Sequence, residues 1–341
     1  GRKVVVNARK PRRRIAIASL GCKLNQAEGE AMRHRCTKAG YEIVPFGQGA
    51  DVYVVNTCTV TAEADRESRR LARRARRLAP EWGRVVLAGC APQANPDEMH
   101  IPEADLLLGN AEKIHLPHHL SLPVRRNGGE ARSPEVRVAP MEDGTRLETF
   151  SLSHFEGRTR ALLKVQDGCD FSCSFCATTL ARGPSRSLGP GACAAQAERL
   201  VGDRHIEIVM TGIHLGAYGR DLEERTTLSR LVRRLLEVRG LGRLRLSSVE
   251  PGELTRELIR TVSTHAYENA TEGEAYVCRH FHIPVQSGDD EVLSRMGRNY
   301  RSEPCASKFE EIGRRIPGVC LGADFISGFP GESDSAFERT L

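Results

Sequence analysis

Long apolar runs are absent from this sequence of 341 residues. No stretch approaches the roughly 20 consecutive apolar residues that a membrane-spanning helix needs. The basic start GRKVVVNARKPRRR is not followed by an apolar segment of signal-peptide length. We therefore expect a cytoplasmic protein with no membrane partner.

Internal repeats and low-complexity segments are also missing. Hydrophobic residues make up 40% of the chain and charged residues 28%, which is typical of globular proteins. The length is sufficient for two domains of ordinary size. The charge is mildly basic, since 50 Lys and Arg stand against 44 Asp and Glu. Such an excess permits a nucleic-acid partner without requiring one.

From residue 14 to about residue 120, short apolar runs alternate with helical patterns. The apolar runs are 14–22, 51–58, 84–90 and 104–110, and the helical patterns cover 25–40 and 61–79. Thr61 is expected to cap the second helix. Short strands separated by helices are typical of a parallel sheet covered on both faces. The sequence therefore predicts an α/β domain with a doubly wound parallel sheet over residues 14–120.

Residues 121–160 are polar and rich in Gly and Pro, and we interpret them as a connection between domains. Alternation resumes at residue 161. Strands are expected at 161–166, 206–212, 243–248, 279–286 and 322–327, with helices at 190–201, 226–238, 252–264 and 302–315. Five β/α units in order predict a partial parallel barrel over residues 161–341. Because the chain stops in the fifth helix, we expect a sequence truncated before the last barrel strand.

Cysteine is frequent, with eleven residues, and the odd total argues against a complete disulfide set. Cys169, Cys173 and Cys176 form C-x3-C-x2-C directly after the first barrel strand. Three thiolates can hold a four-iron cluster and leave one iron open to chelate the amino and carboxylate groups of S-adenosylmethionine. An electron from the cluster then releases a 5′-deoxyadenosyl radical. This use of the spacing resembles that of radical-SAM enzymes, and catalytic groups of such barrels lie on loops after strands.

A zinc site is the alternative for this loop. Zinc prefers four protein ligands in a structural site, and no fourth Cys or His follows closely. His154 or Cys193 could complete such a shell, so a non-catalytic metal-binding or electron-transfer protein stays open as a hypothesis.

Cys22, Cys58 and Cys90 form a second set, because each ends a predicted parallel strand. The carboxyl ends of parallel strands share one edge of a sheet, where ligands bind. A single cysteine there is more often a small buried residue, but three at the same topological position favour a second three-ligand cluster. Core packing is expected for the other five, which are Cys36, Cys193, Cys278, Cys305 and Cys320.

Motifs along nearly the whole chain resemble the methylthiotransferase family of radical-SAM enzymes. They are 20–26 (LGCKLNQ), 56–61 (NTCTVT), 88–90 (AGC), 164–169 (KVQDGC), 181–183 (ARG), 185–187 (SRS), 246–251 (LSSVEP), 282–288 (HIPVQSG) and 328–332 (GFPGE). The sequence around Cys58, QDGC and SSVEP look like the branch that modifies N6-threonylcarbamoyladenosine beside the tRNA anticodon. Thiomethylation of isopentenyladenosine in tRNA, or of a ribosomal-protein aspartate, are the alternatives within the family.

The resemblance implies two 4Fe–4S clusters and S-adenosylmethionine as cofactors. Cys22, Cys58 and Cys90 would hold the auxiliary cluster, where one S-adenosylmethionine methylates sulfur. The loop cluster would cleave a second one to the radical, which abstracts hydrogen from the target carbon before the methylthio group is inserted. The implied partners are the tRNA anticodon stem-loop and an external electron donor. The family's small carboxy-terminal RNA-binding β-domain is absent from the sequence.

The resemblance and the strand-end positions also indicate residues that bind S-adenosylmethionine or substrate. These candidates are Phe175, Thr211, Gly212, Ser247, Glu250, Gln286, Ile326 and Gly328. Strand-end polar residues also serve as ordinary turn caps, which is the alternative for them.

The helix after Cys58 is rich in arginine and is a candidate to bind phosphates of an anticodon stem. The candidates are Arg66, Arg69, Arg70, Arg73, Arg74 and Arg77. The alternative is a solvated helical face, which is the usual role of a run of charges.

Overall fold

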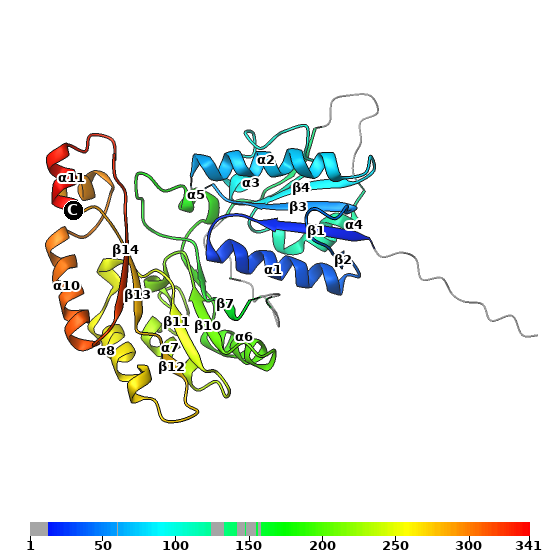
Figure 1. Ribbon diagram of the computed structural model, residues 1–341. Coiled ribbons are helices and arrows are strands. Elements are labelled where there is room, and N and C mark those ends of the chain that lie inside the picture. The colour runs from blue at the N-terminus through cyan, green and yellow to red at the C-terminus, as the bar shows by residue number, and fades with distance from the viewer. Residues whose placement is uncertain (1–12, 60, 124–132, 142–146, 148–154, 156–157) are drawn as a thin grey trace, which may run out of the picture. The chain divides into compact units, whose positions relative to one another are not determined.

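The computed structural model describes residues 13–59, 61–123, 133–141, 147, 155 and 158–341 (Figure 1). The chain divides into two compact units. The first unit comprises residues 1–21 and 31–139, and the second comprises residues 22–30 and 140–341. Most of the expected 121–160 connection, including His154, lies outside the described residues.

The first unit contains a parallel sheet with strand order β2-β1-β3-β4-β5-β6. Its strands are β1 (Arg14–Ser19), β2 (Glu42–Ile43), β3 (Val52–Thr57), β4 (Arg84–Gly89), β5 (Leu106–Leu108) and β6 (Glu135–Arg137). The four strands expected from the sequence are present. The short β2 was not predicted, because two residues carry no clear periodicity and are defined by their pairing with β1. β6 lies in the 121–160 connection, for which the sequence allows short strands but does not predict their position; its pairing with β5 defines it.

Helices cover both faces of this sheet, so the predicted doubly wound fold is confirmed. Its helices are α1 (Lys23–Lys38), α2 (Ala62–Leu78), α3 (Cys90–Ala94) and α4 (Leu116–Ser121), with a 3₁₀ turn at Lys113–His115. One core joins Ile15 and Val54 to Met32 of α1 and Leu116 of α4. Two further cores on the other face include Ala72 and Ala75 of α2.

The second unit contains two groups of parallel strands at the predicted positions. β7 (Arg160–Lys164), β10 (Glu207–Thr211), β11 (Arg243–Leu246) and β12 (Tyr276–Val277) form a sheet in the order β12-β11-β10-β7, and β13 (His280–Gln286) pairs with β14 (Cys320–Phe325). An isolated parallel bridge joins Ser248, just after β11, to His282 of β13. The unexpected strand β12 occupies the edge of β11, so the sheet is less continuous than the sequence predicted.

The helices between these strands lie where the hydrophobic periodicity placed them. They are α6 (Pro190–Gly202), α7 (Leu228–Leu236), α8 (Arg256–Thr264) and α10 (Ser302–Arg315). Shorter elements complete the unit: α5 (Thr178–Arg182), α9 (Asp290–Arg295), α11 (Asp334–Thr340), the antiparallel pair β8 (Gln166–Asp167) and β9 (Arg186–Ser187), and 3₁₀ turns at Leu215–Ala217, Pro251–Glu253 and Tyr267–Asn269. Among the described residues, no helix combines the length and apolar character needed to span a bilayer.

Candidate functional site

The three-cysteine loop follows β7 and β8 and ends at α5, at the carboxyl end of the strands of the second unit. Gln166 organises its start. The fully buried Gln166 amide nitrogen donates to the carbonyls of Asp167 and Gly168, at 3.0 and 2.8 Å, and its oxygen accepts the His214 N–H at 2.8 Å. One side chain therefore ties the cysteine loop to the loop that follows β10.

Gly168 makes the turn into the loop possible. Its φ is +75°, a conformation that costs little only for glycine. A Cβ at this position would collide with the carbonyl of Pro184. The next residue, Cys169, donates its N–H to the Gly183 carbonyl at 3.1 Å. The QDGC motif thus forms a glycine turn between β8 and the cysteine loop.

Cys169 lies against a histidine that is itself paired with a carboxylate. Its Sγ is 3.8 Å from His214 Nδ1, and the ring of Phe171 packs 4.3 Å from the His214 ring. His214 Nε2 lies 3.1 Å from Glu253 Oε1. Burial raises the pKa of the Cys169 thiol to about 11, although the Phe171 N–H lowers it. A positively charged metal centre supplies the compensation that a buried thiolate needs.

The middle of the loop rests on the end of α9. Ser174 donates its N–H to Met296 O at 3.1 Å and its hydroxyl to Arg295 O at 2.9 Å. The Arg298 Nη1 donates to the Sγ of Cys173 at 3.1 Å. Cys176 is exposed, and its thiol contacts the hydroxyl of Thr178 at 3.0 Å.

The donor set fits an iron–sulfur cluster. Each loop thiol contacts a different neighbour, and within the described ranges no three Cys, His, Asp or Glu side chains are already gathered at metal-binding distance. The backbone of the loop is nevertheless fixed by Gln166, Gly168 and Ser174, and Cys176 is exposed to solvent. Three thiolates without a fourth protein ligand suit a cluster that keeps one open iron, and they suit a closed zinc shell poorly.

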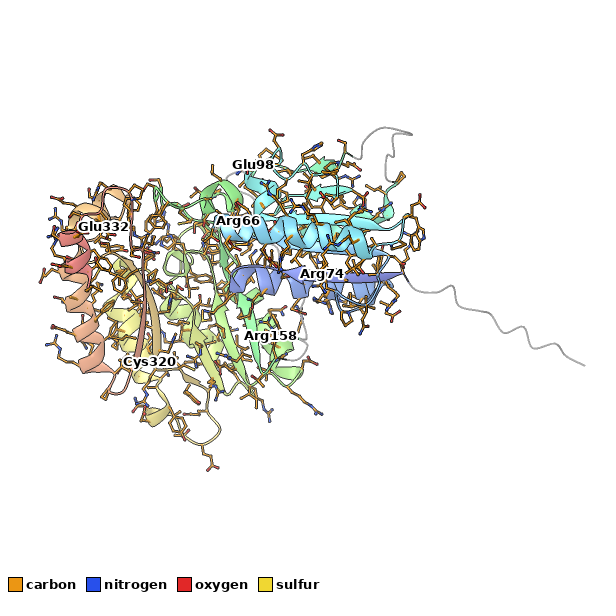
Figure 2. All side chains as sticks on the ribbon, turned by 45° about the horizontal axis from the view of Figure 1, so that its top comes forward. Arg66, Arg74, Glu98, Arg158, Cys320 and Glu332 are labelled. Atoms are coloured by element: carbon orange, nitrogen blue, oxygen red, sulfur yellow. The ribbon has the colours of Figure 1, made fainter. Side chains whose placement is uncertain are left out.

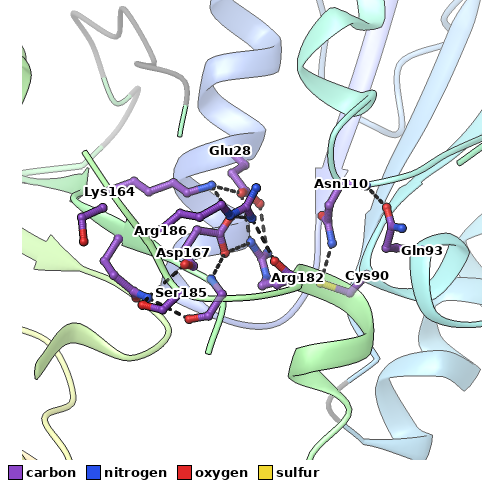
Figure 3. Close-up of polar contacts among 12 residues, drawn as sticks. Glu28, Cys90, Gln93, Asn110, Lys164, Asp167, Arg182, Ser185 and Arg186 are labelled. Carbon is purple, nitrogen blue, oxygen red and sulfur yellow. Dashed lines mark hydrogen bonds and ion pairs between the residues drawn. The ribbon is translucent and has the colours of Figure 1, made fainter. Parts of the chain in front are cut away.

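A buried ion network lies behind the loop in the second unit (Figure 3). Glu28, from the first part of α1, accepts from Lys164 Nζ at 2.6 Å and from both terminal nitrogens of Arg182, at 3.0 and 3.1 Å. Asp167 accepts from Lys164 at 2.7 Å and from Arg182 at 3.0 Å. Arg186 lies 3.7 Å from the Asp167 carboxylate. The network joins the first part of α1 to β7 and β8, which lead into the cysteine loop.

The electrostatics of this network favour the ionised carboxylates. Burial alone would raise the pKa of Asp167, but the charges of Lys164 and Arg182 outweigh burial and lower it to about 2. Both carboxylates therefore face cations in a site from which water is excluded.

In the first unit, two of the other cysteines follow neighbouring strands. Cys58 comes directly after β3 and Cys90 directly after β4. Asn110, just beyond β5, donates its side-chain N–H to Cys90 Sγ at 3.5 Å (Figure 3). Gly21, with φ +78°, lies so close to the Cys58 side chain that a Cβ there would collide with it. Cys22 is the next residue in the chain. The strand order reverses between β1 and β3, which is where ligands bind in doubly wound sheets.

The candidate S-adenosylmethionine residues follow the carboxyl ends of four strands. Thr211 ends β10, Ser247 and Glu250 follow β11, and Gln286 ends β13 with a φ of +70°. The Ser247 hydroxyl is buried and has no hydrogen-bond partner within the described part of the chain.

The remaining candidates of this group lie nearby in sequence. Gly212 lies close to the side-chain amide of Gln166, and a Cβ added to Gly212 would lie 2.8 Å from the Gln166 amide oxygen. Ile326 donates its N–H to Gln286 O at 2.8 Å, and Gly328 donates to Glu332 at 2.6 Å. Phe175 is partly exposed on the cysteine loop.

The arginines of α2 are largely paired with acidic side chains. Arg66, Arg69, Arg70 and Arg73 form ion pairs with Glu63, Glu98, Glu67 and Glu103, and the Arg74 guanidinium lies 6.0 Å from the centre of the Phe46 ring. Figure 2 labels Arg66, Arg74 and Glu98 in this region. Exposed ion pairs are worth about 0–1 kcal/mol; Glu63 and Glu98 are exposed, whereas Glu67 and Glu103 are only partly exposed. Arg76, by contrast, is held by Asp105 and two backbone carbonyls.

Three contacts of the site were not assigned a role from the sequence. His214, Arg298 and Asn110 each place a nitrogen against a cysteine sulfur. His214 and Asn110 follow strands, which is a usable signal. Arg298 lies 122 positions beyond Cys176 in a loop between two helices, and only the tertiary fold brings it to Cys173.

Comparison with known proteins identifies the family. The model described as Uncharacterized protein family UPF0004 matches residues 14–109, and that of the radical SAM superfamily matches residues 163–341. The threonylcarbamoyladenosine tRNA methylthiotransferase MtaB of Bacillus subtilis is 37% identical, over 96% of this chain and 69% of the relative. MtaB of Thermotoga maritima is 35% identical, over 96% of this chain and 70% of the relative.

A solved structure shares the fold. The radical S-adenosylmethionine methyltransferase TsrM from Kitasatospora setae, with cobalamin and a 4Fe–4S cluster bound, matches with a TM-score of 0.63 at 15% identity, covering 96% of this chain and 71% of that chain. The radical SAM family model and the methylthiotransferase relatives together define a radical-SAM transferase. The chain belongs to the methylthiotransferase family of that superfamily, which confirms the resemblance inferred from the motifs. Enzymes of this family use S-adenosylmethionine and 4Fe–4S clusters.

Proposed function

We propose that this chain is a tRNA methylthiotransferase that adds a methylthio group at C2 of N6-threonylcarbamoyladenosine, next to the anticodon. The observation that carries the proposal is the identity of 37% and 35% to two threonylcarbamoyladenosine tRNA methylthiotransferases, over 96% of the chain. The branch-like motifs around Cys58 and Cys169 support the same substrate.

Cys169, Cys173 and Cys176 are the proposed ligands of the radical cluster. Gln166 and Gly168 fix the start of their loop, and Ser174 fixes its middle on α9. Thr211, Ser247 and Glu250 and the other strand-end candidates are the proposed contacts of S-adenosylmethionine and substrate. With cluster and S-adenosylmethionine bound, the site would supply a 5′-deoxyadenosyl radical for hydrogen abstraction.

Cys22, Cys58 and Cys90 are the proposed ligands of the auxiliary cluster, at which S-adenosylmethionine would methylate sulfur. The evidence is topological: Cys58 and Cys90 directly follow adjacent strands, and Cys22 follows the glycine that packs on Cys58. Asn110 would hold the Cys90 sulfur in orientation through its side-chain N–H.

The proposed partners are the tRNA anticodon stem-loop and an external electron donor. The arginines of α2 supply the proposed phosphate contacts. The pairs of Arg66 and Arg69 involve exposed carboxylates, and exposed pairs contribute little to stability. Arg69 is the sharpest candidate, because its partner Glu98 lies on a separate loop at 3.4 Å and is itself exposed.

Nucleoside mass spectrometry tests the substrate. A bacterial host that makes N6-threonylcarbamoyladenosine but lacks its own enzyme of this family is analysed with and without the gene for this chain. We expect 2-methylthio-N6-threonylcarbamoyladenosine to appear in the tRNA. Appearance of 2-methylthio-isopentenyladenosine, or of a thiomethylated ribosomal protein in its place, would contradict the assigned substrate.

Two variants and one control separate the cluster roles. Cys173→Ser is expected to abolish both 5′-deoxyadenosine formation and tRNA thiomethylation. Cys58→Ser is expected to retain 5′-deoxyadenosine formation and lose thiomethylation. The core packing expected for Cys320 is wrong, because this residue is exposed on β14. Cys320→Ser therefore serves as the matched control and should behave as the unchanged protein.

A further inference from the structure

Arg298 is a buried arginine that none of the recognised motifs includes. It lies between α9 and α10, and its side chain is only 4% exposed. An arginine is costly to bury unless every part of the guanidinium finds a partner. The partners of Arg298 therefore indicate why the fold keeps it there.

Three groups from different elements hold the guanidinium. Nη1 donates to Cys173 Sγ at 3.1 Å, Nη2 pairs with the Glu250 carboxylate beyond β11, and Nε donates to the Tyr300 hydroxyl at 2.9 Å. The guanidinium carbon also lies 4.8 Å from the centre of the Tyr300 ring, within cation–π range.

Tyr300 keeps this arrangement rigid. Its hydroxyl lies 3.1 and 3.0 Å from the carbonyls of Pro284 and Val285 in β13 and can donate to either. Burial raises the pKa of Tyr300 to about 12, so the hydroxyl keeps its proton as the donor. Arg298 is thus held at the end of β11 through Glu250 and at the end of β13 through Tyr300, while its Nη1 donates to the sulfur of Cys173.

We propose that Arg298 is a positioning residue that raises the reduction potential of the cluster held by Cys169, Cys173 and Cys176. The inference rests on the proposed function of that loop. A cluster gains negative charge when it is reduced, and hydrogen bonds and positive charge at its sulfurs stabilise the reduced form. Arg298 supplies both at Cys173. Glu250 acts in the opposite direction, because its carboxylate offsets part of the guanidinium charge.

The test is a redox titration of the reconstituted full-length chain, followed by electron paramagnetic resonance. A shared background lacking Cys58 and Cys90 leaves the loop cluster as the only complete ligand set. For Arg298→Met we expect the reduction potential of the cluster to be about 59 mV more negative, for a one-electron couple. At a fixed ambient potential, this shift makes the ratio of reduced to oxidised cluster about tenfold lower. Arg298→Lys should shift the same way by less, and Glu250→Gln should shift the other way.

Arg295→Met is the matched control. It removes an arginine three positions away, whose Nη1 donates to Pro330 O at 3.2 Å and not to a cysteine, and it should leave the potential unchanged. Iron and sulfide content, measured for every variant, identifies proteins that fail to fold or to load. Failure of the unchanged chain to bind a cluster would overturn the proposed function. A loaded Arg298→Met protein with unchanged potential but weakened S-adenosylmethionine binding would overturn this inference alone.

Discussion

Glu28→Gln is the sharpest test of what holds the second unit together. The substitution keeps the shape of the side chain and removes one negative charge from the buried network. In the native network, Lys164, Arg182 and Arg186 face Glu28 and Asp167. After the substitution, the same three cations face Asp167 as the only carboxylate of the network.

The expected loss follows from the burial of this network. Glu28, Lys164, Asp167 and Arg182 are all nearly inaccessible to solvent. Removing one partner of a buried ion pair costs about 3–5 kcal/mol when the remaining charge is left uncompensated. Here Asp167 still contacts Lys164 and Arg182, so the substitution removes only part of their compensation. We therefore expect a loss at the low end of this range, about 3 kcal/mol, in the free energy of opening of β7. Glu237→Gln, in an exposed pair with Arg234, should cost less than about 0.5 kcal/mol.

A second substitution tests the cause. Lys164→Met removes one of the excess cations that Glu28→Gln leaves behind. The double variant should therefore lose less than the sum of the two single losses, with a coupling of about 1–3 kcal/mol.

Hydrogen exchange with mass spectrometry measures the effect locally, which suits a chain of two units better than a global unfolding curve. Amides of Arg160–Lys164 in Glu28→Gln should exchange roughly a hundredfold faster or more, at about 1.4 kcal/mol per factor of ten. Unchanged exchange in β7, or strictly additive losses in the double variant, would refute the reasoning.

Three further outcomes are expected. Because the pKa of Asp167 is lowered from 3.8 to about 2, its contribution to stability is present above about pH 4 and lost as the pH falls toward 2; the acid unfolding curve should lose this component in Asp167→Asn. Gly168→Ala should prevent loading of the loop cluster, because the added Cβ would collide with Pro184 O at a φ of +75°. The added Cβ of the control Gly191→Ala meets no atom within 4 Å, so this variant should load normally; iron content measures both. Thr61→Ala removes the hydroxyl that accepts the Ala64 N–H at the start of α2, and it should lower the free energy of unfolding of the first unit by about 1 kcal/mol. Denaturant unfolding followed by the fluorescence of the single tryptophan, Trp82, measures this loss. An unchanged denaturation midpoint would show that the cap contributes nothing.

Much of the fold was predictable because its signals are local. The strand runs ending at Cys58 and Cys90, the helices between strands and the Thr61 cap all depend on residues within a few positions of one another. The positions of the short strands β2, β6 and β12 escaped prediction, since pairing with a distant neighbour defines each of them.

The reactive groups could be read directly from the sequence: the C-x3-C-x2-C loop, Cys58 and Cys90 at the ends of strand runs, and the motifs of the methylthiotransferase family. The surroundings of those sulfurs became apparent from the folded chain alone. Arg298 reaches Cys173 across 125 positions, and Arg182 reaches Glu28 across 154. The spacing of residues in the sequence does not predict contacts over such separations. They form because burying a charge is costly without a partner, and only the folded chain determines which partner is within reach.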